Sequence, residues 1–385
     1  MKYTSANTRR TARTIPFVCG FLFAAFSFVY LYFLQADLLA FLQFCLSNGQ
    51  THYDALVGAS LITLVLTLFG LCLQRLMSLP VRALALAWLP SCFLLLLLTG
   101  WDTQSGTNDA ICLPSLAQLV ILAVLAVVYL FALFLSRVYH DVASERALFN
   151  IHLAPNLLVL ALAFLVVGIM GNTSTPLHYE LQMERLLDTE RFSDALRVGE
   201  QAQATSPRLS TMRCYALSHE GLLGEQLFAY SLNSGSAQIL PSADAPLREY
   251  AIADSICQYV GLQPSMAHSS ILPYIEHACA RDTVGSPVLR DYLLTACLLD
   301  RDLSRAADLL CTDSLTSFPT HYREALLLLA AQDTTFRVPF ADAPMQQALS
   351  EFLTEMAQKE KPTQPEDRLR RHFAHTYWYY YFFSR

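Results

Sequence analysis

The sequence predicts an all-α membrane protein, in which a polytopic bundle of about five transmembrane helices is followed by a soluble α-solenoid domain. Three observations support this fold class. Long runs without charged side chains occupy the first 170 residues, basic residues flank these runs on alternate sides, and apolar residues recur at helical spacing after residue 172. Only 15% of the 385 residues are charged, whereas an ordinary soluble domain has about 25%.

Five uncharged runs are long enough to cross a bilayer. A helix rises about 1.5 Å per residue, so each run can cover a hydrocarbon core of about 30 Å. The predicted spans are residues 15–34, 55–73, 83–101, 111–135 and 147–170. The first run follows basic residues, as a signal peptide does, but its 20 residues exceed the usual apolar region of about 7–15 residues. We therefore expect it to remain as a span.

The basic residues predict the orientation of the spans. All eight in residues 1–171 fall on one side, which the positive-inside rule assigns to the cytoplasm: Lys2, Arg9, Arg10, Arg13, Arg75, Arg82, Arg137 and Arg146. Residues 1–14 are then a cytoplasmic basic segment, and residues 15–171 form the transmembrane domain. Because the number of spans is odd, residues 172–385 are predicted to form an extracytoplasmic domain.

After residue 172, amphipathic segments alternate with turn signals, which predicts pairs of antiparallel helices. In the clearest pair, the second helix carries inward-facing residues followed by a stop: Phe192, Ala195, Gly199, Ala202 and Pro207. Their spacing resembles the second helix of a tetratricopeptide repeat, in which small residues let two helices approach closely. Ala229 lies 34 residues after Ala195, which is the period of that repeat, and Ala306 takes the same place in a later unit. A non-repetitive all-α domain is the alternative.

Seven consecutive aromatic residues form the C-terminal segment 377–383. Each ring can bury about 150–250 Å², so we expect this segment to be covered rather than free in water. It is predicted to form a last helix that caps the solenoid. The alternative places it in the headgroup layer of the bilayer, which Tyr and Trp favour. The expected anchors are Tyr377, Trp378, Tyr379 and Phe382.

The polar residues exclude several classes of function. Residues 172–385 carry 18 basic and 26 acidic side chains, which argues against nucleic acid as a partner. No nucleotide-binding or hydrolase motif is present, and the ten cysteines form no C-x-x-C pair, so we expect buried thiols and neither a cofactor nor a metal. The closest histidines, His372 and His375, have no third ligand nearby in the sequence.

Polar groups inside the predicted spans are few. None of these spans contains Asp, Glu, Lys or Arg, whereas a transporter needs an ionisable site near the midplane. Transport is therefore not expected. Asn156, which follows Pro155 in the fifth span, is predicted to form hydrogen bonds across the bundle.

The plan of spans, helical domain and tail resembles a known group of proteins. Together with the segments His321–Ala325 (HYREA) and Thr376–Tyr379 (TYWY), it resembles an uncharacterised membrane-protein family of Bacteroidota. The resemblance implies a Gram-negative inner membrane. It supplies no catalytic residues.

Two functional hypotheses follow. The first is an assembly protein, whose spans hold a helical-repeat domain outside the membrane, where it binds envelope proteins or peptides. The alternative is a membrane enzyme, or a subunit of one, that handles lipid-linked glycans. Such an enzyme would need carboxylates in the outer loops, where the candidates are Asp37, Asp54, Asp102 and Asp109. The same four residues are more typical of solvated loops and helix caps than of a catalytic site.

Overall fold

The computed structural model consists of helices and connecting segments, with no strand in the residues it describes. It describes the chain except for residues 1, 48–49, 101–115, 139–148, 173, 201, 203–204, 233–234, 242–251, 263–270, 283–284, 312–317, 358–364 and 385. The all-α prediction is thus confirmed. The chain divides into two compact units, Met1–Ser174 (unit 1) and Thr175–Arg385 (unit 2), where the sequence predicts a boundary after residue 171.

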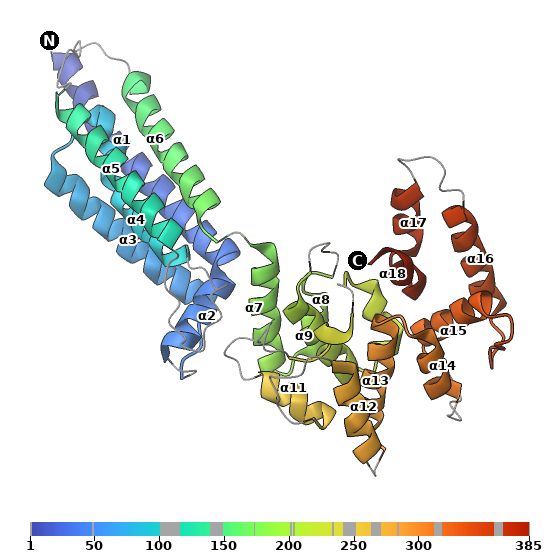
Figure 1. Cartoon of the computed structure of the whole chain (residues 1–385). Coiled ribbons are helices and arrows are strands. Elements are labelled where there is room, and N and C mark those ends of the chain that lie inside the picture. The colour runs from blue at the N-terminus through green and yellow to red at the C-terminus, as the bar shows by residue number, and fades with distance from the viewer. Residues whose placement is uncertain are drawn as a thin grey trace. The chain divides into compact units, whose positions relative to one another are not determined.

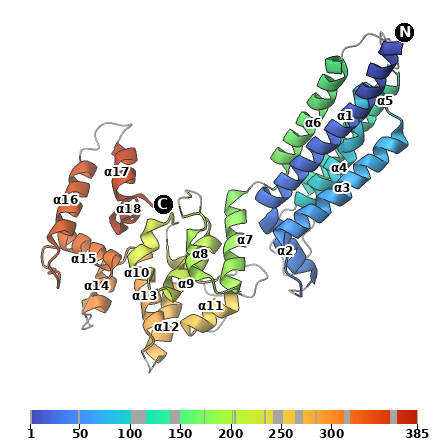
Figure 2. The ribbon, with the colours of Figure 1, turned by 180° about the vertical axis from the view of Figure 1, so that it is seen from behind.

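Unit 1 is a bundle of long helices that lie side by side (Figures 1 and 2). Within the described ranges, five segments are long and apolar enough to cross a membrane: Thr14–Leu34, Ala55–Met77, Val81–Thr99, Leu119–Val138 and Leu153–Met170. They agree with the predicted spans to within several residues, although residues 101, 111–115 and 147–148 of those spans lie outside the described part. Their outward faces are rich in exposed leucine, valine and phenylalanine, as a lipid environment requires.

The helices of unit 1 follow one another with short connections. In chain order they are α1 (Lys2–Val29), the π-helix η1 (Tyr30–Leu34), α2 (Ala36–Ser47), α3 (Ala55–Met77), the 3-10 helix η2 (Val81–Trp88), α4 (Leu89–Thr99), α5 (Leu116–Val138) and α6 (Phe149–Met170). The short helix α2 follows the end of the first span.

Helices of unit 1 pack closely around Trp88. Its ring is fully buried and lies 5.0 Å, between centroids, from the ring of Phe23 on α1. A Cβ atom added to Gly20 would lie 3.1 Å from the indole, and one added to Gly70 on α3 would lie 2.5 Å from it. Because there is no hydrophobic drive between helices in lipid, such small residues are what allow close contact. Two glycines thus let α1 and α3 pack against η2.

The third span is irregular between Pro80 and Pro90, where η2 replaces a full α-helix. Asn156 on α6 supplies hydrogen bonds to this stretch: its Nδ2 donates to Val81 O at 2.8 Å, and its Oδ1 accepts from Ala85 N at 2.7 Å. Backbone groups left unpaired in a membrane cost several kcal/mol. The predicted hydrogen bonds of Asn156 across the bundle are therefore confirmed.

A second polar cluster joins the end of the first span to the ends of the third and fifth. The hydroxyl of Tyr30 lies 3.1 Å from Thr99 Oγ1, and Gln35 Nε2 donates both to that hydroxyl at 3.2 Å and to Asn172 O at 3.1 Å. A Cβ at Gly171 would lie 1.9 Å from the hydroxyl, so the approach requires glycine.

Unit 2 consists of shorter helices, which Figure 1 shows from green to red. They are α7 (Thr175–Asp188), α8 (Phe192–Arg197), α9 (Pro207–His219), α10 (Leu223–Gln226), η3 (Leu227–Ala229), η4 (Ser236–Gln238), α11 (Ile252–Val260), α12 (Ile271–Arg281), α13 (Pro287–Leu299), α14 (Leu303–Cys311), α15 (Thr320–Gln332), α16 (Ala343–Ala357), α17 (Pro365–Phe373) and α18 (Tyr377–Phe383).

Helices α9, α13 and α15 form the core of unit 2, since long stretches of each are buried on every side. Helices α9 and α13 begin in the same way, with Ser206-Pro207 and Ser286-Pro287. Each serine caps its helix by accepting a backbone N–H, and each proline occupies the first helical turn, where no N–H is needed. Pro207, predicted as the residue after a helix stop, therefore begins the next helix.

The predicted repeat residues take different places. Ala195 and Ala306 are buried, and Phe192 stacks on the His219 ring at 4.1 Å between centroids. Helix α8, however, ends at Arg197, so Gly199 and Ala202 lie beyond it. Gly199 has a φ of 60°, which ends helical geometry and which glycine adopts most easily. Ala229 ends the 3-10 turn η3 and is exposed rather than inward-facing.

Candidate functional site

The aromatic tail forms the helix α18 and docks into unit 2. Thr376 caps this helix, since its Oγ1 accepts from Tyr379 N at 3.3 Å. Of the predicted anchors, Tyr377 and Trp378 are fully buried, Tyr379 is half-buried and Phe382 is 38% exposed. The tail is thus covered by its own domain over one face of the helix.

Two tyrosine hydroxyls of α18 bind the C-terminal end of α13. Tyr377 OH donates to Leu298 O at 3.1 Å, and Tyr380 OH donates to Leu299 O at 2.9 Å. The last carbonyls of a helix have no partner within the helix, so the Tyr380 hydroxyl satisfies a buried acceptor at Leu299 O. Leu298 O also accepts from Arg301 N at 3.1 Å, and the Tyr377 hydroxyl gives it a second donor. Burial raises the pKa of Tyr377 well above its ordinary value and that of Tyr380 to about 12, so both donors keep their protons at neutral pH.

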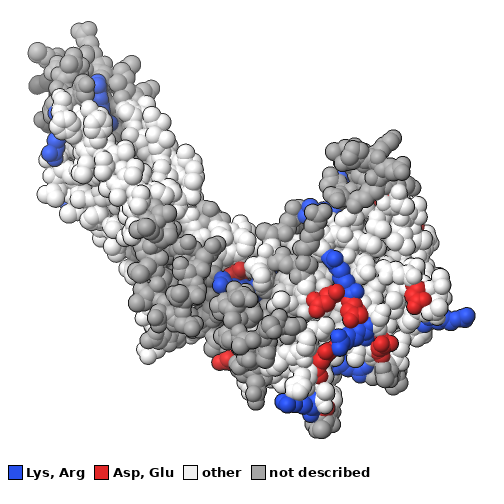
Figure 3. All heavy atoms as spheres, in the orientation of Figure 1, with Lys and Arg blue, Asp and Glu red and all other residues white. Residues whose placement is uncertain are grey.

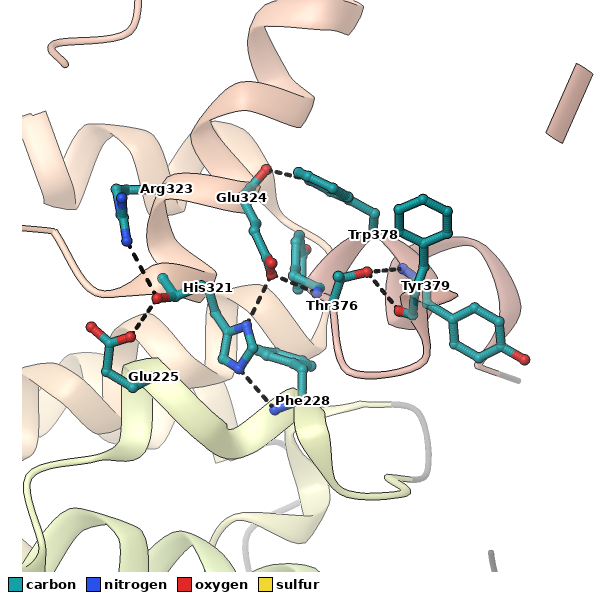
Figure 4. A network of polar contacts seen from close by, with 11 residues as sticks. Glu225, Phe228, His321, Arg323, Glu324, Thr376, Trp378 and Tyr379 are labelled. Carbon is teal, nitrogen blue, oxygen red and sulfur yellow. Dashed lines mark hydrogen bonds and ion pairs between the residues drawn. The ribbon is translucent and has the colours of Figure 1, made fainter. Parts of the chain in front are cut away.

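A buried histidine and glutamate connect α15 to this tail helix (Figure 4). His321 Nδ1 lies 2.9 Å from Glu324 Oε2, and the same oxygen accepts from the backbone N–H of Tyr377 at 2.7 Å. The indole Nε1 of Trp378 donates to Glu324 O at 2.8 Å. One glutamate therefore receives two hydrogen bonds from a segment 53 and 54 residues further along the chain.

The geometry of His321 limits the chemistry of this pair. Its Nε2 lies 3.3 Å from the backbone N of Phe228, which can only donate, so Nε2 is an acceptor. Nδ1 then carries the hydrogen and donates to Glu324. A histidine beside a carboxylate is typical of acid–base catalysis, but there the second nitrogen faces a substrate. Here both nitrogens are bound within the fold, so the pair fastens α15, η3 and α18 together.

Next to this pair, polar contacts continue along α15 to the surface. Arg323 Nη1 lies 2.5 Å from Asp342 Oδ2, and its Nη2 donates to Thr320 Oγ1 at 3.3 Å. Thr320 Oγ1 in turn donates to Glu225 of α10. Helix α15 is thereby joined to α10 on one side and to the start of α16 on the other.

A buried cation that the sequence analysis missed lies elsewhere in unit 2. Arg213 on α9 is fully buried, donates to Gly199 O at 3.0 Å and lies 4.8 Å from the centroid of the Tyr230 ring. Burial lowers the pKa of its guanidinium to about 10. The only sequence signal is an arginine amid the apolar residues Met212 and Cys214. The Arg213 guanidinium holds the turn at Gly199, just after the end of α8.

The four acidic residues of the enzyme hypothesis are only partly described. Asp54 caps α3, since its Oδ1 accepts from Val57 N at 2.9 Å. Asp37 lies in the first turn of α2. Asp102 and Asp109 lie outside the described residues. Helix capping is thus the observed role of Asp54, as the second interpretation of these residues expects.

Within the described ranges, no three His, Cys, Asp or Glu side chains lie close enough to hold a metal ion. His372 and His375 are both exposed. Cys214, Cys257 and Cys297 are free, buried thiols, and burial raises the pKa of Cys214 to about 12. Those three cysteines pack as small apolar side chains.

An open cleft lies between the end of α11, helix α12 and the start of α13. Its volume is about 410 Å³. Residues from all three elements line it, with an apolar floor and a polar rim: Val260, Gly261, Leu262, Tyr274, His277, Ala278, Arg281, Asp282, Ser286 and Leu289.

The docked tail lies wholly, and the cleft partly, within one segment that matches a family model. Residues 279–384 match the model of a family described as "Family of unknown function (DUF6057)". This segment contains α13 to α18, with His321, Glu324 and the tail residues. It agrees with the expected resemblance to an uncharacterised family. No curated protein and no solved structure gives a significant match.

Proposed function

We propose that this chain is a membrane-anchored interaction protein, in which unit 1 holds unit 2 outside the cytoplasm and unit 2 binds protein or peptide partners during envelope assembly. The observation that carries the proposal is a contrast within unit 2. Its most enzyme-like pair, His321 and Glu324, is buried and bound to the backbone, whereas its open cleft has an apolar floor and a polar rim. Such a surface suits binding more than chemistry.

The proposed anchoring rests on charge and apolar surface. The spans are uncharged along the face in Figure 3, and basic side chains lie at the end of unit 1 where the N-terminus lies. Arg75 lies in the last turn of α3, Arg82 at the start of η2 and Arg137 in the last turn of α5. This grouping supports a cytoplasmic N-terminus in a bacterial inner membrane, with unit 2 in the periplasm.

The helix pairs of unit 2 support the proposed mode of binding. Pairs such as α7–α8 and α13–α14, joined by short turns, are the building blocks of α-solenoids that bind peptides, including tetratricopeptide arrays. In Figure 3, acidic and basic side chains are interspersed on the visible face of unit 2. This mixed surface supports a protein partner rather than nucleic acid.

The test is purification of the tagged full chain from cross-linked native membranes in a mild detergent, followed by quantitative identification of bound proteins. We expect at least one envelope protein in near-stoichiometric amount, absent with an equally tagged, unrelated membrane protein. Recovery of the chain alone in two different detergents contradicts the proposal. If cells that carry only Asp37→Ala or Asp102→Ala have a defective envelope, although the variant recovers its partners as the wild type does, the glycan-handling enzyme is favoured instead.

A further inference from the structure

Helix α12 is held in unit 2 on two sides and opens on the cleft on another. Its buried face carries Ile271 and Ile275, and Cys279 Sγ lies 3.9 Å from Leu289 O of α13. A second side is fixed by the ion pair between Glu276 and Arg305. The opposite stripe, at positions i, i+3, i+4 and i+7, opens on the cleft and consists of Tyr274, His277, Ala278 and Arg281.

The neighbouring elements give this cleft an apolar floor. Val260 and Leu262, on either side of Gly261, are buried, and Leu289 is buried on α13. Gly261 has a φ of 81°, which lets the chain turn away at the end of α11. A volume of about 410 Å³ is within the range of about 300–1,000 Å³ typical of ligand sites. The space suits a few residues of an extended chain.

One cation at the rim is available to a ligand. Arg281 is exposed, and within the described part of the chain no acidic side chain pairs with it. The adjacent carboxylate of Asp282 is bound to the fold, because its Oδ2 accepts from Ser286 N at 2.6 Å at the start of α13. A guanidinium offers a planar fork of donors that matches a carboxylate.

We propose that this cleft binds an extended peptide segment in which an acidic side chain is adjacent to an apolar one. The apolar side chain packs against the half-buried Tyr274 and Ala278, and the carboxylate contacts Arg281. The inference rests on the proposed function, since it names the class of partner segment. Residues 172–385 carry a net charge of −8, from 18 basic and 26 acidic side chains, so long-range attraction does not draw in such a segment. Recognition is therefore a short-range contact.

The experiment measures peptide binding to the full chain in detergent micelles by fluorescence anisotropy. The probe is a fluorescein-labelled peptide that alternates leucine and glutamate, with two matched peptides that carry glutamine or lysine in place of glutamate. We expect the glutamate peptide to bind about two- to fivefold more tightly than the glutamine peptide, as for an exposed ion pair.

The charge-reversal variant gives the sharpest result. Arg281→Glu should reverse the order, so that the lysine peptide binds most tightly, and Arg281→Gln should abolish the difference between the peptides. Arg337→Glu is the matched control, because Arg337 is an exposed arginine in the connection between α15 and α16. It should leave the order unchanged. Far-UV circular dichroism shows whether each variant is folded.

Each outcome has a defined meaning. Equal binding of the three peptides, absence of binding, or an unchanged order in folded Arg281→Glu overturns the inference. If envelope partners still co-purify with Arg281→Glu in near-stoichiometric amount, the proposed function stands and this cleft is not the site. If no partner co-purifies even with the wild-type chain, the proposed function itself fails.

Discussion

The imidazole of His321 and the carboxylate of Glu324 lie one helical turn apart on α15, with Nδ1 2.9 Å from Oε2, and the same Oε2 accepts the backbone N–H of Tyr377. Two donors from different parts of the chain thus converge on one buried oxygen. The arrangement makes the carboxylate the attachment point of the tail helix.

Removing this oxygen should therefore loosen the tail. Glu324→Ala leaves two buried donors without an acceptor, and each costs about 1–3 kcal/mol. Glu324→Gln should be milder, because an amide oxygen can accept both hydrogen bonds. The thermal unfolding midpoint of the full chain in detergent should fall in the order wild type, Gln, Ala. An alanine variant as stable as the wild type is inconsistent with this role.

The Tyr377 hydroxyl should contribute more to stability than a neighbouring hydroxyl. Tyr377→Phe removes a buried donor from Leu298 O and should lower the free energy of unfolding by about 1 kcal/mol. The matched control is Tyr381→Phe, because Tyr381 is only half-buried and makes ring contacts with its neighbours. Urea unfolding of both variants measures the difference. Equal losses would mean that the hydroxyl contact with α13 is not stabilising.

Alkaline pH should release the tail. Burial raises the pKa of Tyr380 from 10.0 to about 12, so the folded chain keeps a proton that the unfolded chain loses in this window. The contribution of this proton to the free energy of unfolding is therefore fully present below about pH 10 and is lost as the pH rises towards 12. The difference between a Tyr380 pKa of 10.0 in the unfolded chain and about 12 in the folded chain corresponds to roughly 2–3 kcal/mol of stability.

The test of this pH dependence compares Tyr380→Phe with the wild type. Tyr380→Phe lacks the titrating group, and its unfolding free energy should fall less steeply between pH 10 and 12 than that of the wild type. Urea unfolding across this range measures both slopes, with Tyr381→Phe as the control. Identical slopes in the wild type and Tyr380→Phe rule out this titration as the cause.

Two glycines of unit 1 should differ in how much stability is lost on substitution by alanine. A Cβ at Gly70 would lie 2.5 Å from the buried Trp88 ring, whereas a Cβ at Gly168 meets nothing within 4 Å. Gly70→Ala should cost about 1–3 kcal/mol through overpacking, and Gly168→Ala should cost almost nothing. Thermal unfolding in detergent compares the two. A larger loss for Gly168→Ala would place the close helix contact elsewhere.

The proposed orientation predicts opposite results for two reporter fusions. A fusion after Arg75 should place a reporter in the cytoplasm, and a fusion after Asn172 should place it outside. Green fluorescent protein should therefore fluoresce only in the first fusion, and alkaline phosphatase should be active only in the second. Phosphatase activity after Arg75 would reverse the proposed orientation.

The spans could be predicted closely because a bilayer imposes one strong constraint. Every backbone polar group must be paired inside the segment, and the length must match the hydrocarbon thickness, so an uncharged run such as residues 55–73 has one stable structure. The role of Asn156 also followed, since an amide in lipid needs partners. That the partners of Asn156 lie in η2 could not be predicted, because the 3-10 helix in the third span depends on packing between helices.

The helix boundaries of unit 2 were less predictable. The spacing of Phe192 and Ala202 predicts one continuous helix, but the chain turns at Gly199, where the buried guanidinium of Arg213 binds the carbonyl. A buried arginine on α9 thus overrides local helical periodicity on α8. Sequence spacing reports which residues share a face of an ideal helix and does not report contacts between separate helices.

By itself, the sequence determined the helical fold class, the five apolar segments and the presence of an aromatic tail that must be covered, because these depend on local composition and length. Only the tertiary structure decided what covers the tail and what His321 does. His321 binds the backbone N–H of Phe228, 93 residues away in the chain, and its partner Glu324 binds that of Tyr377, 53 residues away. Hydrogen bonds at such separations exist only after folding has brought η3, α15 and α18 together.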